Sequence, residues 1–139
     1  MFQIAKVARL VFIFFFLVVL LFIYAYLPLT IDIGSDEIGR VGRNMFFYTV
    51  IGTFIGLYFI THFLRYYVDR LGIGELQRLY IHILPSVLYF ALTLLVGFIG
   101  VNNNADDIEP STFFYLNYIS VILIFGWIIG FLFALVRRK

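Results

Sequence analysis

The stretch THFLRYYVDRLGIGELQRLYIH (residues 61–82) decides the fold of this chain. It contains both histidines of the protein, three of its ten lysine and arginine residues and three of its ten tyrosines. Apolar runs of membrane length lie on each side of it, and the two glycines near its centre predict a turn. We therefore interpret the stretch as the polar base of a transmembrane hairpin.

The composition of the chain indicates that the folded protein is surrounded by lipid. Hydrophobic residues make up 63% of the 139 residues and charged residues only 13%, whereas a soluble domain has about 25% charged residues. A soluble domain of this size would lack the polar side chains to cover its surface. The chain also has no cysteine, which excludes disulfides, thiol catalysis and cysteine-ligated metals.

Outward from the hairpin, the sequence contains four apolar segments. They cover residues 10–27, 45–64, 79–100 and 113–136. The shortest spans about 27 Å as a helix, close to the ~30 Å thickness of the hydrocarbon core. None has the alternating polar pattern of a barrel strand. We predict an all-α membrane protein whose residues 1–139 form one domain, an antiparallel bundle of four transmembrane helices without a soluble domain.

Lysine and arginine are distributed unequally between the two predicted sides of the membrane. The N-terminus, the middle turn and the tail contain Lys6, Arg9, Arg65, Arg70, Arg78, Arg137, Arg138 and Lys139, whereas the other side has only Arg40 and Arg43. Because short cytoplasmic loops carry an excess of positive charge, we predict that both termini and the middle turn are cytoplasmic. The expected location is the cytoplasmic (inner) membrane of a bacterium.

Small residues predict where the helices pack closely, because membrane helices associate through close backbone contact. The second, third and fourth helices contain Gly52, Gly56, Gly97, Gly100, Gly126 and Gly130. These glycines are expected to contact other helices, either of this chain or of another subunit. The first helix is rich in phenylalanine and poor in small residues, so we expect it to lie at the periphery. Asn44 is expected to cap the second helix, and Pro85 to kink the third.

His62 and His82 are the candidate cofactor ligands. Each lies a few residues inside the membrane from the middle turn, so the two are expected at similar depth on neighbouring helices. Equal depth would suit bis-histidine ligation of haem b, or a quinone pocket. A purely structural role, with the rings hydrogen-bonded at the interface, fits the same pattern. No metal site is predicted.

Three arginines of the middle turn are the candidate contacts for partners. Arg65, Arg70 and Arg78 would suit anionic lipid headgroups or an acidic protein surface. Arg65 and Asp69 are also four residues apart on one helix, which favours an ordinary ion pair between them.

The predicted spans contain no Asp, Glu, Lys or Arg, which argues against an ion-coupled carrier. No nucleotide-binding, catalytic or DNA-binding motif is present. We therefore predict that the chain is not an enzyme but an accessory subunit of a larger inner-membrane complex. Its expected partners are the lipid bilayer and other membrane subunits, reached through helix faces and the 65–78 turn, and not nucleic acid. The alternatives are a haem- or quinone-associated anchor of a redox complex and a small transporter or lipid-handling protein.

Overall fold

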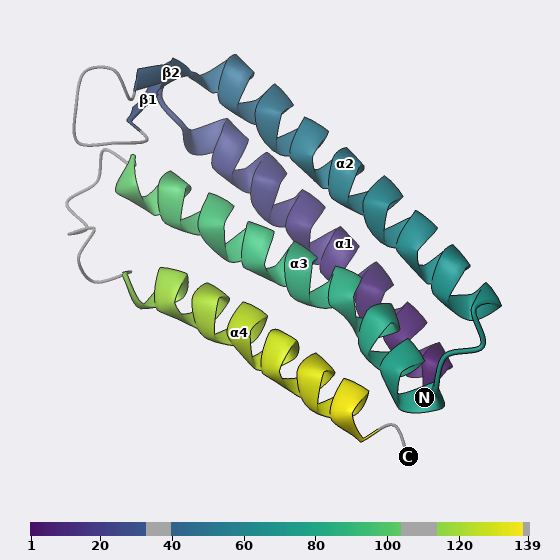
Figure 1. Cartoon of the computed structure of the whole chain (residues 1–139). Helices are drawn as coiled ribbons and strands as arrows, with labels where there is room; N and C mark the ends of the chain where they lie inside the picture. Colours follow the sequence, from purple (N-terminus) through teal and green to yellow (C-terminus); the bar gives the residue numbers. More distant parts are fainter. Residues whose placement is uncertain (33–39, 104–113, 138–139) are drawn as a thin grey trace.

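The protein is a bundle of four long helices with a short β-hairpin at one end (Figure 1). We analysed a computed structural model, which describes residues 1–32, 40–103 and 114–137. The elements in chain order are α1 (Phe2–Tyr26), β1 (Thr30–Asp32), β2 (Arg40–Gly42), α2 (Arg43–Arg70), α3 (Glu75–Asn102) and α4 (Tyr115–Val136). All four helices are long and apolar enough to cross a membrane, as the sequence predicts for an integral membrane protein.

Three helices extend beyond their predicted spans at the same end of the bundle. α1 begins at Phe2, α2 continues to Arg70, and α3 begins at Glu75. Lys, Arg, Gln and Glu are good helix formers, so a helix does not end where its apolar run ends. The predicted 65–78 turn is therefore reduced to residues 71–74, and Lys6 and Arg9 lie within α1 instead of before it.

Two glycines form the 71–74 turn. Gly72 has a φ of 59°, a left-handed conformation that glycine adopts without strain and that commonly ends helices. Gly74 donates its N–H to Oε1 of Gln77 at 3.2 Å, which satisfies one of the free donors at the start of α3. Figure 1 shows that this turn, the start of α1 and the end of α4 lie at one end of the bundle, here called the terminal end.

α3 is the central helix, and it packs against each of the other three. The prediction that the first helix lies at the periphery is wrong, because α1 packs extensively along α3. Phe16 and Leu20 of α1 are fully buried. The Phe16 ring stacks on Phe54 of α2 at 4.7 Å between centroids, and Phe54 in turn meets Tyr89 of α3 at 5.2 Å. Aromatic side chains, and not small residues, thus form this contact between α1, α2 and α3.

The predicted packing glycines fall into two groups. A Cβ on Gly130 would lie 2.8 Å from the Tyr80 ring, and one on Gly100 would lie 2.8 Å from Ile23. At these two positions a larger residue would clash, at the α3–α4 contact and at the α1–α3 contact respectively. By contrast, a Cβ at any of the other four would meet no heavy atom of the described chain within 4 Å; these are Gly52, Gly56, Gly97 and Gly126.

The β-hairpin closes the other end of the bundle. β1 and β2 pair antiparallel, with Ile31 opposite Val41, and the Ile31 side chain is fully buried in the same core cluster as Phe16. Three-residue strands are too short to produce a readable alternation, and burial of Ile31 is a tertiary effect.

The predicted cap of the second helix is also corrected. α2 begins at Arg43 with Gly42 in the capping position and without a side-chain cap. Asn44 does not cap it, since its Oδ1 accepts a hydrogen bond from the Tyr24 hydroxyl at 2.9 Å. α3 runs through Pro85 as one helix from Glu75 to Asn102.

Candidate functional site at the terminal end

An ion-paired cluster joins three helices at the terminal end. Nε2 of His82, on α3, lies 3.0 Å from Oδ1 of Asp69, near the end of α2. Nε of Arg78, one helical turn before His82, lies 3.7 Å from the same carboxylate oxygen. A single carboxylate of α2 thus faces two nitrogen-bearing side chains of α3, across the 71–74 turn.

Phe2 at the start of α1 covers this cluster. Its ring meets the His82 ring edge to face, with 5.1 Å between centroids. The guanidinium carbon of Arg78 lies 4.5 Å from the centre of the same ring, within the range of a cation–π contact. Lys6 lies one turn further along α1. It lines a cavity of about 350 Å³ together with Phe2, Asp69, Arg78 and His82. The cluster therefore depends on α1 as well as on the α2–α3 hairpin.

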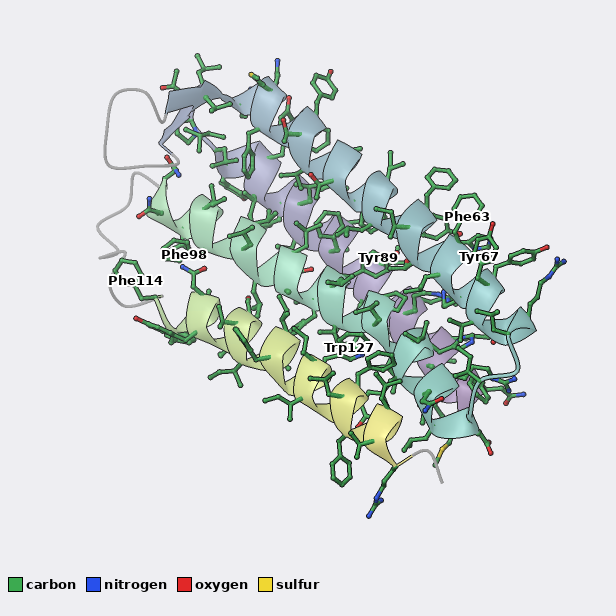
Figure 2. All side chains as sticks on the ribbon, viewed as in Figure 1. Phe63, Tyr67, Tyr89, Phe98, Phe114 and Trp127 are labelled. Atoms are coloured by element: carbon green, nitrogen blue, oxygen red, sulfur yellow. The ribbon has the colours of Figure 1, made fainter. Side chains whose placement is uncertain are left out.

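Two hydrogen bonds connect α4 to α3 in the same region. Gln77 is 3% exposed, and its Nε2 donates to the carbonyl oxygen of Ala134 at 3.2 Å. Trp127 donates its indole N–H to the carbonyl oxygen of Tyr80 at 2.9 Å. Figure 2 shows Trp127 on the side of α4 that faces α3. α4 is apolar on all sides, so hydrophobicity alone does not determine which side faces α3. These two hydrogen bonds determine it.

The two histidines lie in different environments. His82 is buried, and its Nε2 is occupied by Asp69. His62 is exposed on α2, where its ring lies near those of Tyr58 and Phe63 of its own helix. The structure therefore offers no support for the bis-histidine haem alternative, which needs both rings to face one space.

The three predicted contact arginines also separate. Arg65 donates from Nε to the backbone oxygen of Thr61 at 3.1 Å. Among the described residues, Asp69 pairs with Arg78 and His82 and not with Arg65 as predicted. The guanidinium carbon of Arg70 lies 4.2 Å from the centre of the Tyr66 ring. Only Arg78 belongs to the cluster. Neighbouring Phe63 and Tyr67 point outward from α2 (Figure 2), and both are exposed.

The next polar side chain of α3 does not join the cluster. Ser86 follows His82 by one helical turn, but its Oγ is buried without a hydrogen-bond partner, so the histidine–carboxylate pair does not extend to a nucleophile. Among residues 1–32, 40–103 and 114–137, no group of His, Cys, Asp or Glu could hold a metal ion. What remains is a set of fixed charges of both signs beside an aromatic ring.

Sequence reasoning identified His82 and Arg78 but missed Asp69, Phe2 and Lys6 as their neighbours. One signal for Asp69 was available. On the side of the membrane rich in lysine and arginine, it is one of only two acidic residues, the other being Glu75. Nothing in the sequence indicated that the start of α1 would cover the hairpin.

No family model, no curated protein and no solved structure matches this chain. The function is therefore argued from the geometry of its own residues. Two features carry that argument: the open glycine positions on α2, and the charged cluster with the cavities beside it.

Proposed function

We propose that the chain is a non-catalytic accessory subunit of a larger complex in the bacterial cytoplasmic (inner) membrane. The observation that carries this proposal is an unoccupied face of small residues on α2. The face consists of Thr49, Gly52, Thr53 and Gly56, which recur at spacings of three and four residues and so share one side of the helix. It is called the α2 small-residue face below.

The α2 small-residue face is shaped for another helix. Gly52 and Gly56 have no heavy atom of the described chain within 4 Å of an added Cβ. The hydroxyls of Thr49 and Thr53 donate to the backbone of their own helix, at 2.8 and 2.9 Å, so neither presents an unsatisfied group. Membrane helices use such small, smooth faces for close backbone approach, and in the described part of the chain no helix comes this close to the two glycines. A helix of a partner subunit is the occupant we propose.

The orientation we propose places both termini and the 71–74 turn in the cytoplasm, with successive helices crossing the membrane in opposite directions. The excess of lysine and arginine at the terminal end supports this orientation. Exposed Arg70 then lies at the cytoplasmic interface, where it is available to acidic partner surfaces or to anionic headgroups.

Site-specific photo-crosslinking in native membranes tests the proposed interface. A photoreactive amino acid at Thr53 is expected to yield a crosslinked product with a stoichiometric membrane partner. Gly52→Leu and Gly56→Leu should abolish that product, because the larger side chains keep the helices apart. Ala25→Leu, which enlarges an exposed small residue of α1, should leave it intact.

Two results would refute the proposal. One is a Thr53 probe that crosslinks only to lipid in native membranes. The other is a crosslinked partner that survives both glycine substitutions.

A further inference from the structure

We propose that the terminal end holds one phospholipid of the ethanolamine type, with an acyl chain between α1, α3 and α4 and its phosphate on Lys6 and Arg78. The site uses helix surfaces other than the α2 small-residue face. A test of this lipid site is therefore independent of a test of the proposed function.

The acyl chain would occupy an almost wholly apolar groove of about 460 Å³. Its lining comes from three helices and includes Ala8 and Phe12 of α1, Ile83 and Phe90 of α3, and Leu123 of α4. The volume lies within the ~300–1,000 Å³ typical of ligand pockets. Ser86 is the one polar residue among the described residues that line the groove.

The length of the groove favours a lipid over a transmembrane helix. Along α3 it runs from Leu79 to Phe90, about 16 Å at 1.5 Å per residue. That is about half of the ~30 Å hydrocarbon core, or the depth of one leaflet. An acyl chain ends at the middle of the bilayer, whereas a crossing helix would need a groove along the full length of α3.

Two cavities with charged lining residues lie next to the groove at the terminal end. A second cavity, of about 410 Å³, shares Met1 and Leu79 with the groove and adds Glu75. The 350 Å³ cavity that contains Lys6 and Arg78 shares Phe2 with this second cavity. The apolar groove and the charged cavities are therefore neighbours at the terminal end, and their order of polarity matches that of a phospholipid from tail to headgroup.

The charges around the mouth select the headgroup. Arg78 approaches Asp69 through Nε, and its side chain is 39% exposed, which leaves its terminal nitrogens for a phosphate oxygen. Lys6 is exposed on the same cavity and supplies a second cation. Glu75 is an exposed anion at the neighbouring cavity and would attract a primary ammonium. A phosphate–ammonium headgroup satisfies both signs, whereas phosphatidylglycerol has the same phosphate but offers no cation to Glu75.

Native mass spectrometry of the full chain, exchanged into equal mixtures of phosphatidylethanolamine and phosphatidylglycerol, tests the site. We expect one retained lipid, with ethanolamine favoured about tenfold, the factor equivalent to one charge-assisted hydrogen bond. Glu75→Gln should remove the preference between headgroups. Lys6→Gln combined with Arg78→Gln should lower retention of both lipids about tenfold or more. Arg137→Gln, which removes an exposed charge that lines none of the three cavities, is the matched control and should change nothing.

A groove variant separates the acyl chain from the headgroup. Ala8→Phe fills the groove and should abolish retention, whereas Val11→Phe, at an exposed position of the same helix, should not. The surface variants keep the test valid if Ala8→Phe fails to fold. Retention of phosphatidylglycerol equal to or above that of phosphatidylethanolamine would overturn the proposal, as would binding that is insensitive to Arg78 and Lys6.

Discussion

At the scale of single residues, the main role of Asp69 is to satisfy His82. The Asp69 side chain is 46% exposed, and ion pairs at such positions contribute only about 0.2–1 kcal/mol. The His82 side chain is 11% exposed, and an unpaired buried polar group costs about 1–3 kcal/mol. The larger effect is therefore the hydrogen bond that the ring of His82 would lose.

Asp69→Ala should destabilise the protein by about 1 kcal/mol, toward the lower end of the range for an unpaired buried group because water reaches the carboxylate. Thermal unfolding in detergent, followed by circular dichroism, measures this change. Arg70→Ala removes an exposed charge next in sequence and should change stability by less than about 0.5 kcal/mol. Equal effects of the two substitutions would show that the Asp69–His82 contact does not stabilise the fold.

Gln77 tests a second buried contact, because its amide makes two hydrogen bonds of opposite sense. Gln77→Glu preserves the acceptor for Gly74 but cannot donate to Ala134, so α4 loses one anchor. We expect a loss of about 1–3 kcal/mol in the same unfolding measurement. Gln3→Glu, at an exposed position of α1, is the control and should be nearly neutral. A neutral Gln77→Glu would mean that this bond does not hold α4.

At the scale of elements, α4 shows how a nearly uniform apolar helix acquires a defined packing face. Only Ala134 of α4 is classed as buried, so burial of large side chains does not orient the helix. Two hydrogen bonds orient α4, from Trp127 to the Tyr80 carbonyl and from Gln77 to the Ala134 carbonyl. Gly130 adds to this, because the Tyr80 ring packs against it.

Gly130→Leu should therefore destabilise the α3–α4 contact, whereas Gly126→Leu should not. The Gly130 substitution forces the Tyr80 ring to move, and overpacking of this kind costs about 1–3 kcal/mol. At Gly126 an added Cβ meets no described atom within 4 Å. Unfolding of the two variants by increasing SDS fraction compares them directly. The prediction fails if Gly126→Leu is as destabilising as Gly130→Leu.

At the scale of the whole molecule, both ends of the bundle are closed by residues outside the apolar runs. The terminal end is closed by the Asp69 cluster and Phe2. The other end is closed by the β-hairpin, where Arg43 donates from Nη1 to the Leu27 carbonyl at 3.2 Å and its guanidinium lies over the Tyr24 ring. The difference in positive charge between these ends underlies the proposed orientation.

The absence of cysteine allows this orientation to be tested with single cysteines. Leu71→Cys, in the 71–74 turn, should react with a membrane-impermeant maleimide only after permeabilisation, because the turn is proposed to be cytoplasmic. Leu29→Cys, beside the β-hairpin, should react in intact spheroplasts. Both residues are exposed. The reverse labelling pattern would contradict the proposed topology.

The sequence by itself determined the four helices that are long and apolar enough to cross a membrane, because hydropathy is summed locally over each segment. It also identified the polar hairpin and placed His82 and Arg78 at its base. Only the tertiary structure decided which faces pack: that Phe16 is buried while Gly52 is open, and that Asp69 meets His82. The physical reason is that lipid and protein interiors are about equally apolar. Hydrophobicity therefore predicts that a segment enters the membrane, but not which side of it touches another helix.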